Sequence, residues 1–354
     1  MSRVVRLDKR RVGKGNPVLV VAEISANHGR SLDKAVAMVR KARECGADAV
    51  KFQTYTPDTL TIDSGSRYFR IKHSKWGGQS LYDLYKKAYT PWKWFERLKK
   101  EAGKAGLLFF STAFDRTAVD FLEKLGVPAH KIASFELVDL PLVEYAASKK
   151  KPLILSTGMA TLREIGEAVK AARNAGAKDI ILMKCVSSYP ASPEEMNLRT
   201  IPDMEKKFKA PVGLSDHTLG AGAPLAAVAL GARVVEKHFT LSRKRKTPDS
   251  FFSMEPEELR SLVDGVRTAE RALGGICYGL TSGQRSSRVF RRSLFVVRDM
   301  DKGEVFTEMN VRSIRPADGL EPKHIAKVLG RRSRKKIKKG TPLSWDHIAQ
   351  RTRT

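Results

Sequence analysis

The stretch PLILSTGMATLREIGEAVKAARNAGAKDIILMKC, residues 152–185, decides the fold of this chain. It opens and closes with short, continuously apolar runs, a pattern typical of strands that are buried on both faces of a parallel sheet. Between these runs, Thr161 and Glu164 form the capping-box pair that begins a helix, and Gly176 stands where a helix C-cap belongs. The stretch therefore predicts one strand–helix–strand unit.

The same unit recurs from about residue 17 to about residue 275. Apolar runs of strand length alternate with helical patterns, and there are eight of them: VLVVAE (18–23), DAVKFQ (48–53), LLFFST (107–112), HKIAS (130–134), PLILST (152–157), DIILMKC (179–185), APVGLS (210–215) and RVVEKH (233–238). Ser31, for example, can cap the helix that Gly46 would end. Eight units predict an α/β fold, a (β/α)8 TIM barrel. A doubly wound open sheet is the alternative, but no GxGxxG motif follows the first run.

The sequence changes character beyond about Gly283. KGEVFTEMNV (302–311) resembles KGTPLSWDHI (339–348), and each copy has a Lys-Gly turn, an apolar pair and a hydroxyl that can cap a short helix. We therefore expect residues 1–275 to form the barrel and residues 276–287 to form a linker. Residues 288–354 are expected to form a small, loop-rich second domain.

Charge is the most unusual bulk property of the sequence. Its 66 lysines and arginines against 38 aspartates and glutamates give a net charge of +28, and RRSRKKIKK (331–339) is the densest basic run. Such a charge fits a polyanion partner, an anionic substrate or simply a solvated face. No recognised nucleic-acid motif accompanies it, so no specific nucleic-acid partner is expected.

Other patterns bear on location and cofactors. No run of 18 apolar residues is present, and the N-terminus lacks the apolar stretch of a secretory signal, so no membrane span or membrane partner is expected. The three cysteines, Cys45, Cys185 and Cys277, are widely spaced, which argues against a disulfide framework and a structural zinc site. These features predict a cytoplasmic protein.

Polar side chains end nearly every apolar run. The active site of a TIM barrel lies at the carboxyl ends of its strands, so these side chains would converge on one mouth. In chain order they include Glu23, Lys51, Gln53, Thr112, Lys131, Ser134, Glu136, Ser156, Lys184, Ser187, Tyr189, Ser215, His217, Glu236 and His238. One polar strand end is ordinarily a satisfied hydrogen-bonding group, whereas a whole ring of them predicts a site.

His217 and His238 follow neighbouring strands of the predicted barrel. Their imidazoles could bind one divalent metal, which would leave open positions for water and substrate oxygens and could polarise a carbonyl. The alternative is two separately satisfied core histidines. Lys51 and Lys131 could bind phosphate, or one of them could form a Schiff base. Together with nearby serines they favour a phosphorylated or carboxylated substrate.

Six motifs together resemble the sialic acid synthase family: AEISANHGRSLDKA (22–35), VKFQTYTPDTLT (50–61), KIASFE (131–136), LSTGMA (155–160), LSDHTLG (214–220) and EKHFTL (236–241). The tail resembles the antifreeze-like SAF domain of that family, and the resemblance spans about residues 18–348. Three stretches are most similar to the pseudaminic acid synthase branch: QTYTPDTLT (53–61), LYDLYKKAYTPWKW (81–94) together with Trp76, and SFE (134–136). The N-acetylneuraminate and legionaminate synthases are the alternatives.

The resemblance implies a reaction and its partners. Carbon 3 of phosphoenolpyruvate attacks the aldehyde of an open-chain N-acetylated amino sugar, water adds at carbon 2, and phosphate leaves by C–O cleavage. For the pseudaminic acid branch the acceptor is 2,4-diacetamido-2,4,6-trideoxy-L-altrose. The family also implies a divalent metal (Mn, Mg or Co) that polarises the aldehyde.

The resemblance assigns roles to positions of this sequence. His217 and His238 match the metal ligands, and the expected catalytic residues are Glu23, Glu136 and Lys51. The positions that match phosphoenolpyruvate or sugar binding are Gln53, Thr112, Lys131, Ser134, Ser156, Ser187, Tyr189, Ser215 and Asp249. Arg315 matches an arginine that the SAF domain sends into the partner's barrel, which implies a domain-swapped homodimer.

Two positions depart from the family pattern. Ser187 stands where the neuraminate branch has an asparagine, and its shorter side chain reaches less far toward the acceptor. The sequence STAF (111–114) replaces STPF or SSPF and keeps Thr112. We expect activity to survive both changes.

Two other functions fit parts of the pattern. A Schiff-base aldolase on the same barrel would use Lys131 or Lys184 covalently and would need no metal. A non-enzymatic protein could instead bind polyanions through its basic tail.

Overall fold

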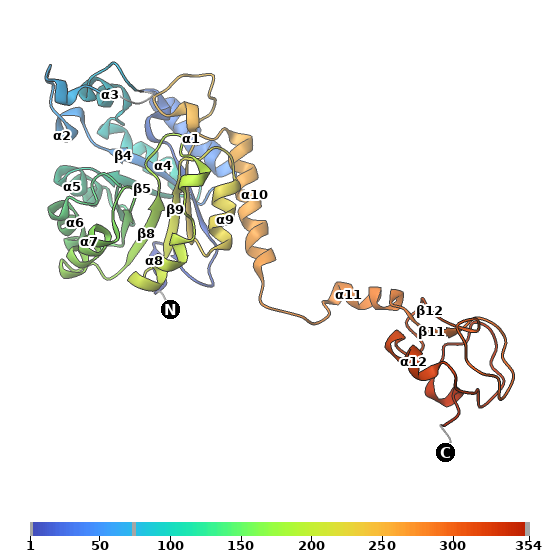
Figure 1. Cartoon of the computed structure of the whole chain (residues 1–354). Helices are drawn as coiled ribbons and strands as arrows, with labels where there is room; N and C mark the ends of the chain where they lie inside the picture. Colours follow the sequence, from blue (N-terminus) through green and yellow to red (C-terminus); the bar gives the residue numbers. More distant parts are fainter. Residues whose placement is uncertain (1–2, 73–75, 351–354) are drawn as a thin grey trace. The chain divides into compact units, whose positions relative to one another are not determined.

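The computed structural model describes residues 3–72 and 76–350. The chain divides into two compact units between Gly274 and Gly275 (Figure 1). The first unit holds the predicted strand–helix units, the second holds the tail, and each has its own hydrophobic core. No helix within the described ranges is long and apolar enough to cross a membrane.

The first unit is a closed barrel of eight parallel strands in which β10 closes the ring by pairing with β3. The strands are β3 (Leu19–Glu23), β4 (Ala49–Thr54), β5 (Leu108–Ala113), β6 (His130–Ile132), β7 (Leu153–Ser156), β8 (Ile180–Cys185), β9 (Val212–Asp216) and β10 (Val234–His238). Each predicted apolar run overlaps one of these strands. The predicted TIM barrel is therefore confirmed.

Helices surround the barrel (Figure 1). They are α1 (Leu32–Glu44), α4 (Phe95–Lys104), α5 (Arg116–Leu125), α6 (Leu140–Ser148), α7 (Leu162–Asn174), α8 (Thr200–Phe208), α9 (Gly222–Ala229) and α10 (Pro256–Leu273). Between β4 and α4 the chain adds two more, α2 (Pro57–Leu60) and α3 (Leu81–Ala88). Shorter 3-10 helices are η1 (Ser25–His28), η2 (Arg67–Phe69), η3 (Trp92–Trp94), η4 (Pro193–Glu195) and η5 (Ser250–Phe252).

The predicted helix boundaries have the expected local chemistry. The Ser31 hydroxyl accepts a hydrogen bond from a backbone N–H of the first turn of α1, and Thr161 and Glu164 form the predicted capping box of α7. Gly46 and Gly176 follow the ends of these helices with φ of 88° and 106°. Because this left-handed backbone favours glycine, the two residues end their helices without strain.

Side chains along the barrel strands alternate between two environments, as the period of a strand requires. In β10, Val235 packs outward against the helices, whereas Val234 belongs to a second cluster inside the barrel. The hairpin of β1 (Val5–Leu7) and β2 (Arg10–Val12) contributes its apolar side chains to this inner cluster. The inner cluster gathers residues from the starts of the strands, so the carboxyl ends are left for polar groups.

The second unit has a small core around the antiparallel pair of β11 (Ser293–Val296) and β12 (Val311–Ile314). Its other elements are α11 (Ser282–Ser287), α12 (Ile325–Val328), η6 (Arg288–Phe290), η7 (Pro322–His324) and η8 (Trp345–His347). Helix α11 lies within the segment that we expected to be a linker. In the predicted repeat, the second copy forms η8 after its cap, whereas the first copy forms only a turn at 308–310.

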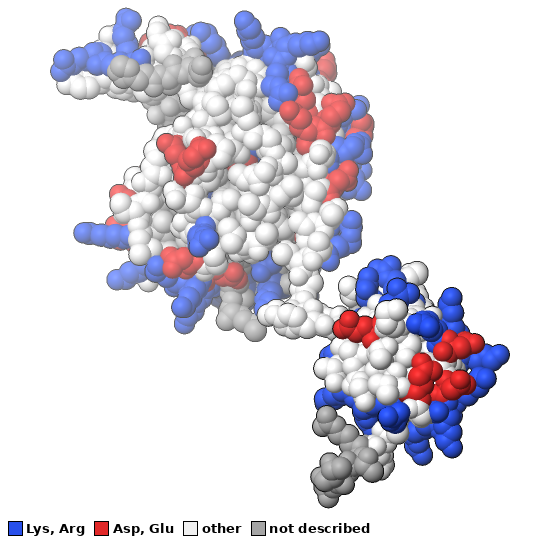
Figure 2. Space-filling model, turned by 45° about the vertical axis from the view of Figure 1, so that its right-hand side comes forward, with Lys and Arg blue, Asp and Glu red and all other residues white. Residues whose placement is uncertain are grey.

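The basic run 331–339 lies on the surface of the second unit, and Figure 2 shows lysine and arginine side chains over much of that unit's visible face. Within the run, Ser333 and Ile337 point inward, and Ile337 packs in the core. The intervening basic side chains are mostly exposed. The run is thus a surface segment of the second unit, in which exposed basic residues are interrupted by two buried residues that anchor the segment.

Candidate active site

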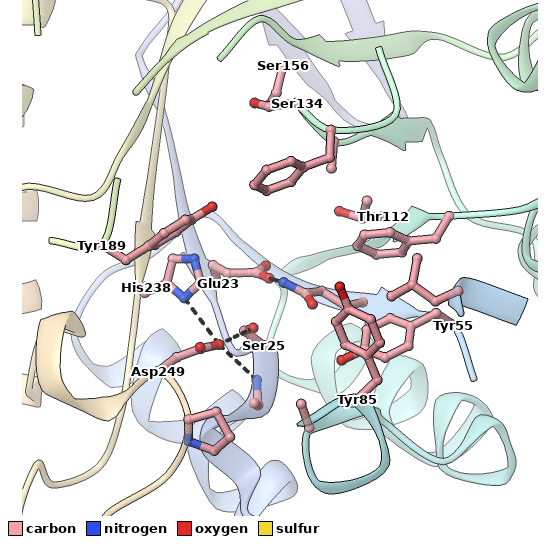
Figure 3. Close-up of a pocket in the computed structure, with 18 of the residues that line it drawn as sticks. Glu23, Ser25, Tyr55, Tyr85, Thr112, Ser134, Ser156, Tyr189, His238 and Asp249 are labelled. Atoms are coloured by element: carbon pink, nitrogen blue, oxygen red, sulfur yellow. Dashed lines mark hydrogen bonds and ion pairs between the residues drawn. The ribbon is translucent and has the colours of Figure 1, made fainter. Parts of the chain in front are cut away.

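A cavity of about 530 Å³ opens at the carboxyl ends of the barrel strands. All but two of the residues to which the family resemblance assigned a role line it: Glu23, Lys51, Gln53, Thr112, Lys131, Ser134, Glu136, Ser156, Tyr189, Ser215, His217, His238 and Asp249. Figure 3 shows labelled members of this set converging from different strands and loops. The two exceptions are Ser187 and Arg315.

Strand alternation explains which polar residues enter the cavity. In β10, Glu236 and His238 share the inward side with Val234, while Lys237 between them points outward and pairs with Asp216. In β8, Lys184 has the outward register of Leu182 and does not line the cavity. Lys184 therefore does not point toward the site, which weakens its role as a covalent lysine.

Two lysines and two carboxylates form the charged base of the cavity. The Lys51 Nζ atom lies 2.8 Å from Glu23 Oε2 and 3.4 Å from Glu236 Oε1, and it donates a 3.0 Å hydrogen bond to Thr112 Oγ1. The Lys131 Nζ atom lies 3.8 Å from the same oxygen of Glu236. Only 2% of Lys51 and 5% of Lys131 are exposed, so neither lysine extends to the surface.

Burial and these ion pairs shift the pKa values in opposite directions. Burial alone would lower the pKa of Lys51, but Glu23 and Glu236 raise it above its usual value. Burial would raise the pKa of Glu236, but Lys131 and Lys51 lower it. The pKa of Glu23 is raised, chiefly by its burial. The base therefore contains one firmly charged lysine, Lys51, and one carboxylate, Glu236, that both lysines share.

Ser134 and Ser156 lie across the cavity from His238 (Figure 3). The Ser134 hydroxyl accepts a 3.1 Å hydrogen bond from the backbone N–H of Gly158, and the buried Ser156 hydroxyl makes no hydrogen bond within the described chain. A side chain at Gly158 would come within 2.3 Å of Ser187 Oγ and 2.8 Å of Ser134 Oγ. Glycine at position 158 thus permits the close approach of both serines, and Ser187 packs behind it instead of lining the cavity.

The rings of His217 and His238 lie in an edge contact with their centres 5.4 Å apart. The Nδ1 atom of His217 lies 2.8 Å from the carbonyl oxygen of Val186, which suits an N–H donor there and leaves Nε2 with a free lone pair. The Nδ1 atom of His238 is buried without a hydrogen-bond partner in the described chain and lies 3.9 Å from Asp249 Oδ2. Burial and the nearby cations lower the pKa of His238 well below its usual value, so its imidazole is neutral.

The open Nε2 of His217 and the unpartnered Nδ1 of His238 fit a divalent metal. Among the described residues, no set of three or more His, Cys, Asp or Glu side chains is arranged to hold a metal. A metal bound to His217 and His238 would therefore take its remaining ligands from water or substrate, as an open catalytic site requires.

Asp249 reaches the site on a loop that follows β10. Its Oδ2 atom accepts a 2.5 Å hydrogen bond from the Ser25 hydroxyl and a 3.4 Å bond from the backbone N–H of Ala26. Asn27 fixes the same loop by donating to the backbone oxygen of Phe239 and the Ser253 hydroxyl. The SANH motif at 25–28 therefore positions the Asp249 carboxylate beside His238 (Figure 3).

Glu136 lies in the loop that follows β6 and places a buried carboxylate oxygen, Oε2, in the cavity without a hydrogen-bond partner in the described chain. Burial raises the pKa of this carboxyl to about 7, although the positive charge of Lys131 opposes the shift. A carboxyl with this pKa can give or take a proton near neutral pH.

Comparison with known proteins identifies the family. A family model described as the NeuB family matches residues 38–278, and the SAF domain model matches residues 291–349. The chain belongs to the NeuB family. It is 44% identical to the pseudaminic acid synthase of Campylobacter jejuni, over 92% of this chain and 95% of that protein. It is 36% identical to the N,N'-diacetyllegionaminic acid synthase of Legionella pneumophila, over 95% of this chain and 96% of that protein.

A solved structure supports the same family. The N-acetylneuraminic acid synthetase of Leptospira borgpetersenii, crystallised with citrate, is 34% identical to this chain and superposes with a TM-score of 0.72. The match covers 81% of this chain and 95% of that one. The NeuB-type enzyme described here is therefore related to three kinds of synthase that differ in their sugar.

Sequence reasoning assigned no catalytic or binding role to several residues that line the cavity. Glu236 was expected among the polar strand ends at the barrel mouth, and the structure places it inside the barrel with His238. Ser25 carried no such signal, since its role depends on a contact with Asp249, 224 positions later. Tyr55 and the apolar side chains of α3 also line the cavity. The stretches that contain them, 53–61 and 81–94, marked the resemblance to one branch of the family, but no site role was predicted for these side chains.

Arg315 lies in the second unit, where its side chain is exposed beside β12. The expected entry of Arg315 into a partner's barrel stays a prediction.

Proposed function

We propose that this enzyme condenses phosphoenolpyruvate with 2,4-diacetamido-2,4,6-trideoxy-L-altrose to give pseudaminic acid and phosphate. The observation that carries the reaction class is the buried ring of Lys51, Lys131, Glu236 and the two open histidines at one barrel mouth. The higher identity to a pseudaminic acid synthase than to a legionaminic acid synthase supports this sugar.

Phosphoenolpyruvate takes the charged base in this proposal. Its carboxylate and phosphate are anions, and Lys51 and Lys131 are the buried cations nearest the cavity floor. Hydroxyls of Thr112, Ser134, Ser156 and Ser215 supply further donors, and the unpaired Ser156 hydroxyl gains a partner when an anion binds. Glu236 lies near both lysines through one oxygen and orients them before the substrate arrives.

The acceptor sugar presents its aldehyde to the side of the cavity that holds His217 and His238. A divalent metal held there would act as a Lewis acid toward the aldehyde oxygen. Imidazole ligands favour manganese or cobalt over magnesium at this position. Asp249 lies beside this pair and accepts hydrogen bonds, so it can also orient a sugar hydroxyl.

Two carboxyl groups transfer protons in the proposed reaction. As carbon 3 of phosphoenolpyruvate bonds to the aldehyde carbon, the aldehyde oxygen gains a proton, which Glu136 supplies from its protonated form. Water then bonds to carbon 2, and Glu23, which accepts a 3.0 Å hydrogen bond from Gln53 Nε2, orients that water and receives its proton. The C–O bond between carbon 2 and phosphate then breaks as the new hydroxyl on carbon 2 gives its proton to the departing phosphate, and a 2-keto acid remains.

A homodimer completes the proposal. The exposed Arg315 of one subunit would enter the barrel mouth of the partner subunit and add a cation at the sugar end of the cavity. Equilibrium sedimentation of the full chain checks the dimer. Reduced sugar affinity in Arg315→Ala, with an unchanged dimer, checks the role of the residue.

Three acceptors test the sugar. Purified full-length enzyme is incubated with phosphoenolpyruvate, manganese and one of three sugars: the altrose derivative, N-acetylmannosamine or the diacetamido precursor of legionaminic acid. Mass spectrometry identifies the products. We expect the altrose derivative to have the highest kcat/KM. Preference for either of the other sugars would replace the proposed acceptor, and turnover of none would overturn the reaction.

The Schiff-base alternative makes an opposite prediction. Borohydride added during turnover would trap a reduced adduct on Lys131 in an aldolase, whereas the proposed reaction leaves every lysine unmodified. Peptide mass mapping separates the two outcomes.

A further inference from the structure

Helix α3 turns its apolar stripe toward the active-site cavity. Leu81, Leu84, Tyr85 and Ala88 have the i, i+3, i+4, i+7 spacing of one helical face, and all four line the cavity. The charged residues of the helix lie on its exposed side: Asp83, Lys86 and Lys87. An amphipathic helix normally covers a protein core, so a stripe that lines a cavity implies that a ligand covers it.

Leu60 and Ile71 extend the same surface from the neighbouring segment. We call Leu60, Ile71, Leu81, Leu84 and Ala88 the apolar wall. Among the described residues, the three hydrophobic core clusters contain none of these five side chains. The segment that carries them, residues 55–88, is added between β4 and α4. The wall is therefore not a by-product of barrel packing.

An aromatic corner joins the wall to the barrel. Tyr55 has its ring centre 5.7 Å from that of Tyr85 and 5.1 Å from that of Phe114, both in edge contacts. Figure 3 shows Tyr55 and Tyr85 together on the side of the cavity away from Ser134 and Ser156. The cavity thus has a charged and hydroxyl-lined part and an apolar part, which suits a substrate pair of which one is anionic and the other carries methyl groups.

We infer that the apolar wall selects the acceptor sugar by contacting its methyl groups, namely the C6 methyl and the methyl ends of its acetamido groups. This inference rests on the proposed function, and it assigns sugar selection to a segment outside the barrel strands. Phosphoenolpyruvate has no methyl group and is drawn to the lysines, so the acceptor is the substrate that the wall can recognise.

The expected size of this selection follows from pocket chemistry. One methylene in a hydrophobic pocket changes kcat/KM by about 10- to 200-fold, and a hydroxyl placed against such a pocket is rejected by about 100-fold. We therefore expect the enzyme to prefer a 6-deoxy acceptor over its 6-hydroxy analogue by about 10- to 100-fold.

Two matched isoleucines test the wall. Ile71 lines the cavity, and both its backbone N–H and its carbonyl are bonded across the local hairpin to Gln79 and Gly78, so a substitution leaves these backbone bonds in place. Ile62 lies on the same segment but is 59% exposed and does not line the cavity. Ile71→Asn should lower the 6-deoxy preference by about tenfold or more, with the KM for phosphoenolpyruvate unchanged, whereas Ile62→Asn should leave both values as in the wild type.

A second pair of variants controls for effects of misfolding. Leu84→Asn should reduce the preference as Ile71→Asn does, and Leu84→Met, which keeps an apolar side chain of similar volume, should restore it. The role of the wall would be overturned if both asparagine variants kept the wild-type preference ratio. It would also be overturned if they changed the KM for phosphoenolpyruvate instead. If the wild type converts none of the sugars, the proposed function fails; if it converts them without 6-deoxy preference, only the wall fails.

Discussion

Replacing Glu136 with glutamine removes a carboxyl group that the fold holds close to neutrality. Burial raises its pKa from the usual 4.5 to about 7, and one pKa unit corresponds to about 1.4 kcal/mol. Folding therefore shifts the free-energy balance of Glu136 toward its protonated form by about 3 kcal/mol. At pH 7 about half of the free enzyme carries the proton, against roughly one molecule in 300 for an ordinary glutamate.

The pH profile of kcat/KM for the sugar reports this group in the enzyme that has not yet bound the sugar. Because the protonated carboxyl serves the aldehyde oxygen, wild-type kcat/KM should fall about tenfold per pH unit above pH 7. Glu136→Gln should lower kcat/KM by about 100- to 10,000-fold at pH 6 and should lose that alkaline decline. The assay follows phosphate release from pH 5.5 to pH 9 at constant ionic strength, with saturating phosphoenolpyruvate and varied sugar.

The same substitution changes the pH dependence of stability. The folded pKa of Glu136 exceeds the unfolded value, so the folded state binds more protons, and stabilisation that is complete below pH 4.5 is lost as pH rises through 7. Glu136→Gln lacks this loss. We compare the free energies of unfolding in urea of the variant and the wild type at two pH values. The difference, variant minus wild type, should be about 3 kcal/mol larger at pH 8 than at pH 4.5.

Glu167→Gln, at an exposed carboxylate of α7 paired with Arg163, is the matched control and should leave both profiles unchanged. A wild-type profile that stays flat to pH 9 would refute proton transfer by Glu136. So would a Glu136→Gln enzyme that keeps activity within tenfold of wild type and the same alkaline decline.

Three further predictions concern the metal, the buried ion pair and the charge. His217→Ala and His238→Ala should each remove most activity with little change in Tm, and chelation should abolish turnover that manganese restores; turnover that survives chelation contradicts the metal site. Lys237→Ala breaks a pair with Asp216 that is almost fully buried and should cost about 3–5 kcal/mol in urea unfolding, whereas Lys149→Ala in a half-exposed pair should cost below about 1 kcal/mol. The net charge of +28 should steer anionic phosphoenolpyruvate, so kcat/KM should fall as ionic strength rises at fixed pH; no change would exclude steering.

The barrel was predictable because its signals are local. A run such as DIILMKC (179–185) is mostly apolar because both of its faces are buried, and the Thr161 capping box marks where the helix before it begins. Much of the site followed from the fold, since parallel strands bring their carboxyl ends to one mouth. Strand period even distinguishes the inward Glu236 from the outward Lys237.

Other parts of the site depend on contacts that no local pattern encodes. The pKa of Glu136 depends on how deeply its loop is buried, and the lysine pair depends on a carboxylate from β10 that lies beside Lys51 of β4. Ser25 takes a positive φ of 45° and holds Asp249 from the far end of the barrel sequence. Electrostatic coupling falls with distance through space, so separation along the chain does not predict it.

The sequence by itself determined the order of strands and helices, the end of the barrel that carries the polar residues, and the family. The tertiary structure decided what each apolar face covers. The spacing of Leu81, Leu84 and Ala88 shows that α3 has an apolar side, and only the fold shows that this side borders the cavity instead of the core. Hydrophobic burial is non-directional, so an amphipathic pattern requires a cover without specifying whether protein or substrate provides it.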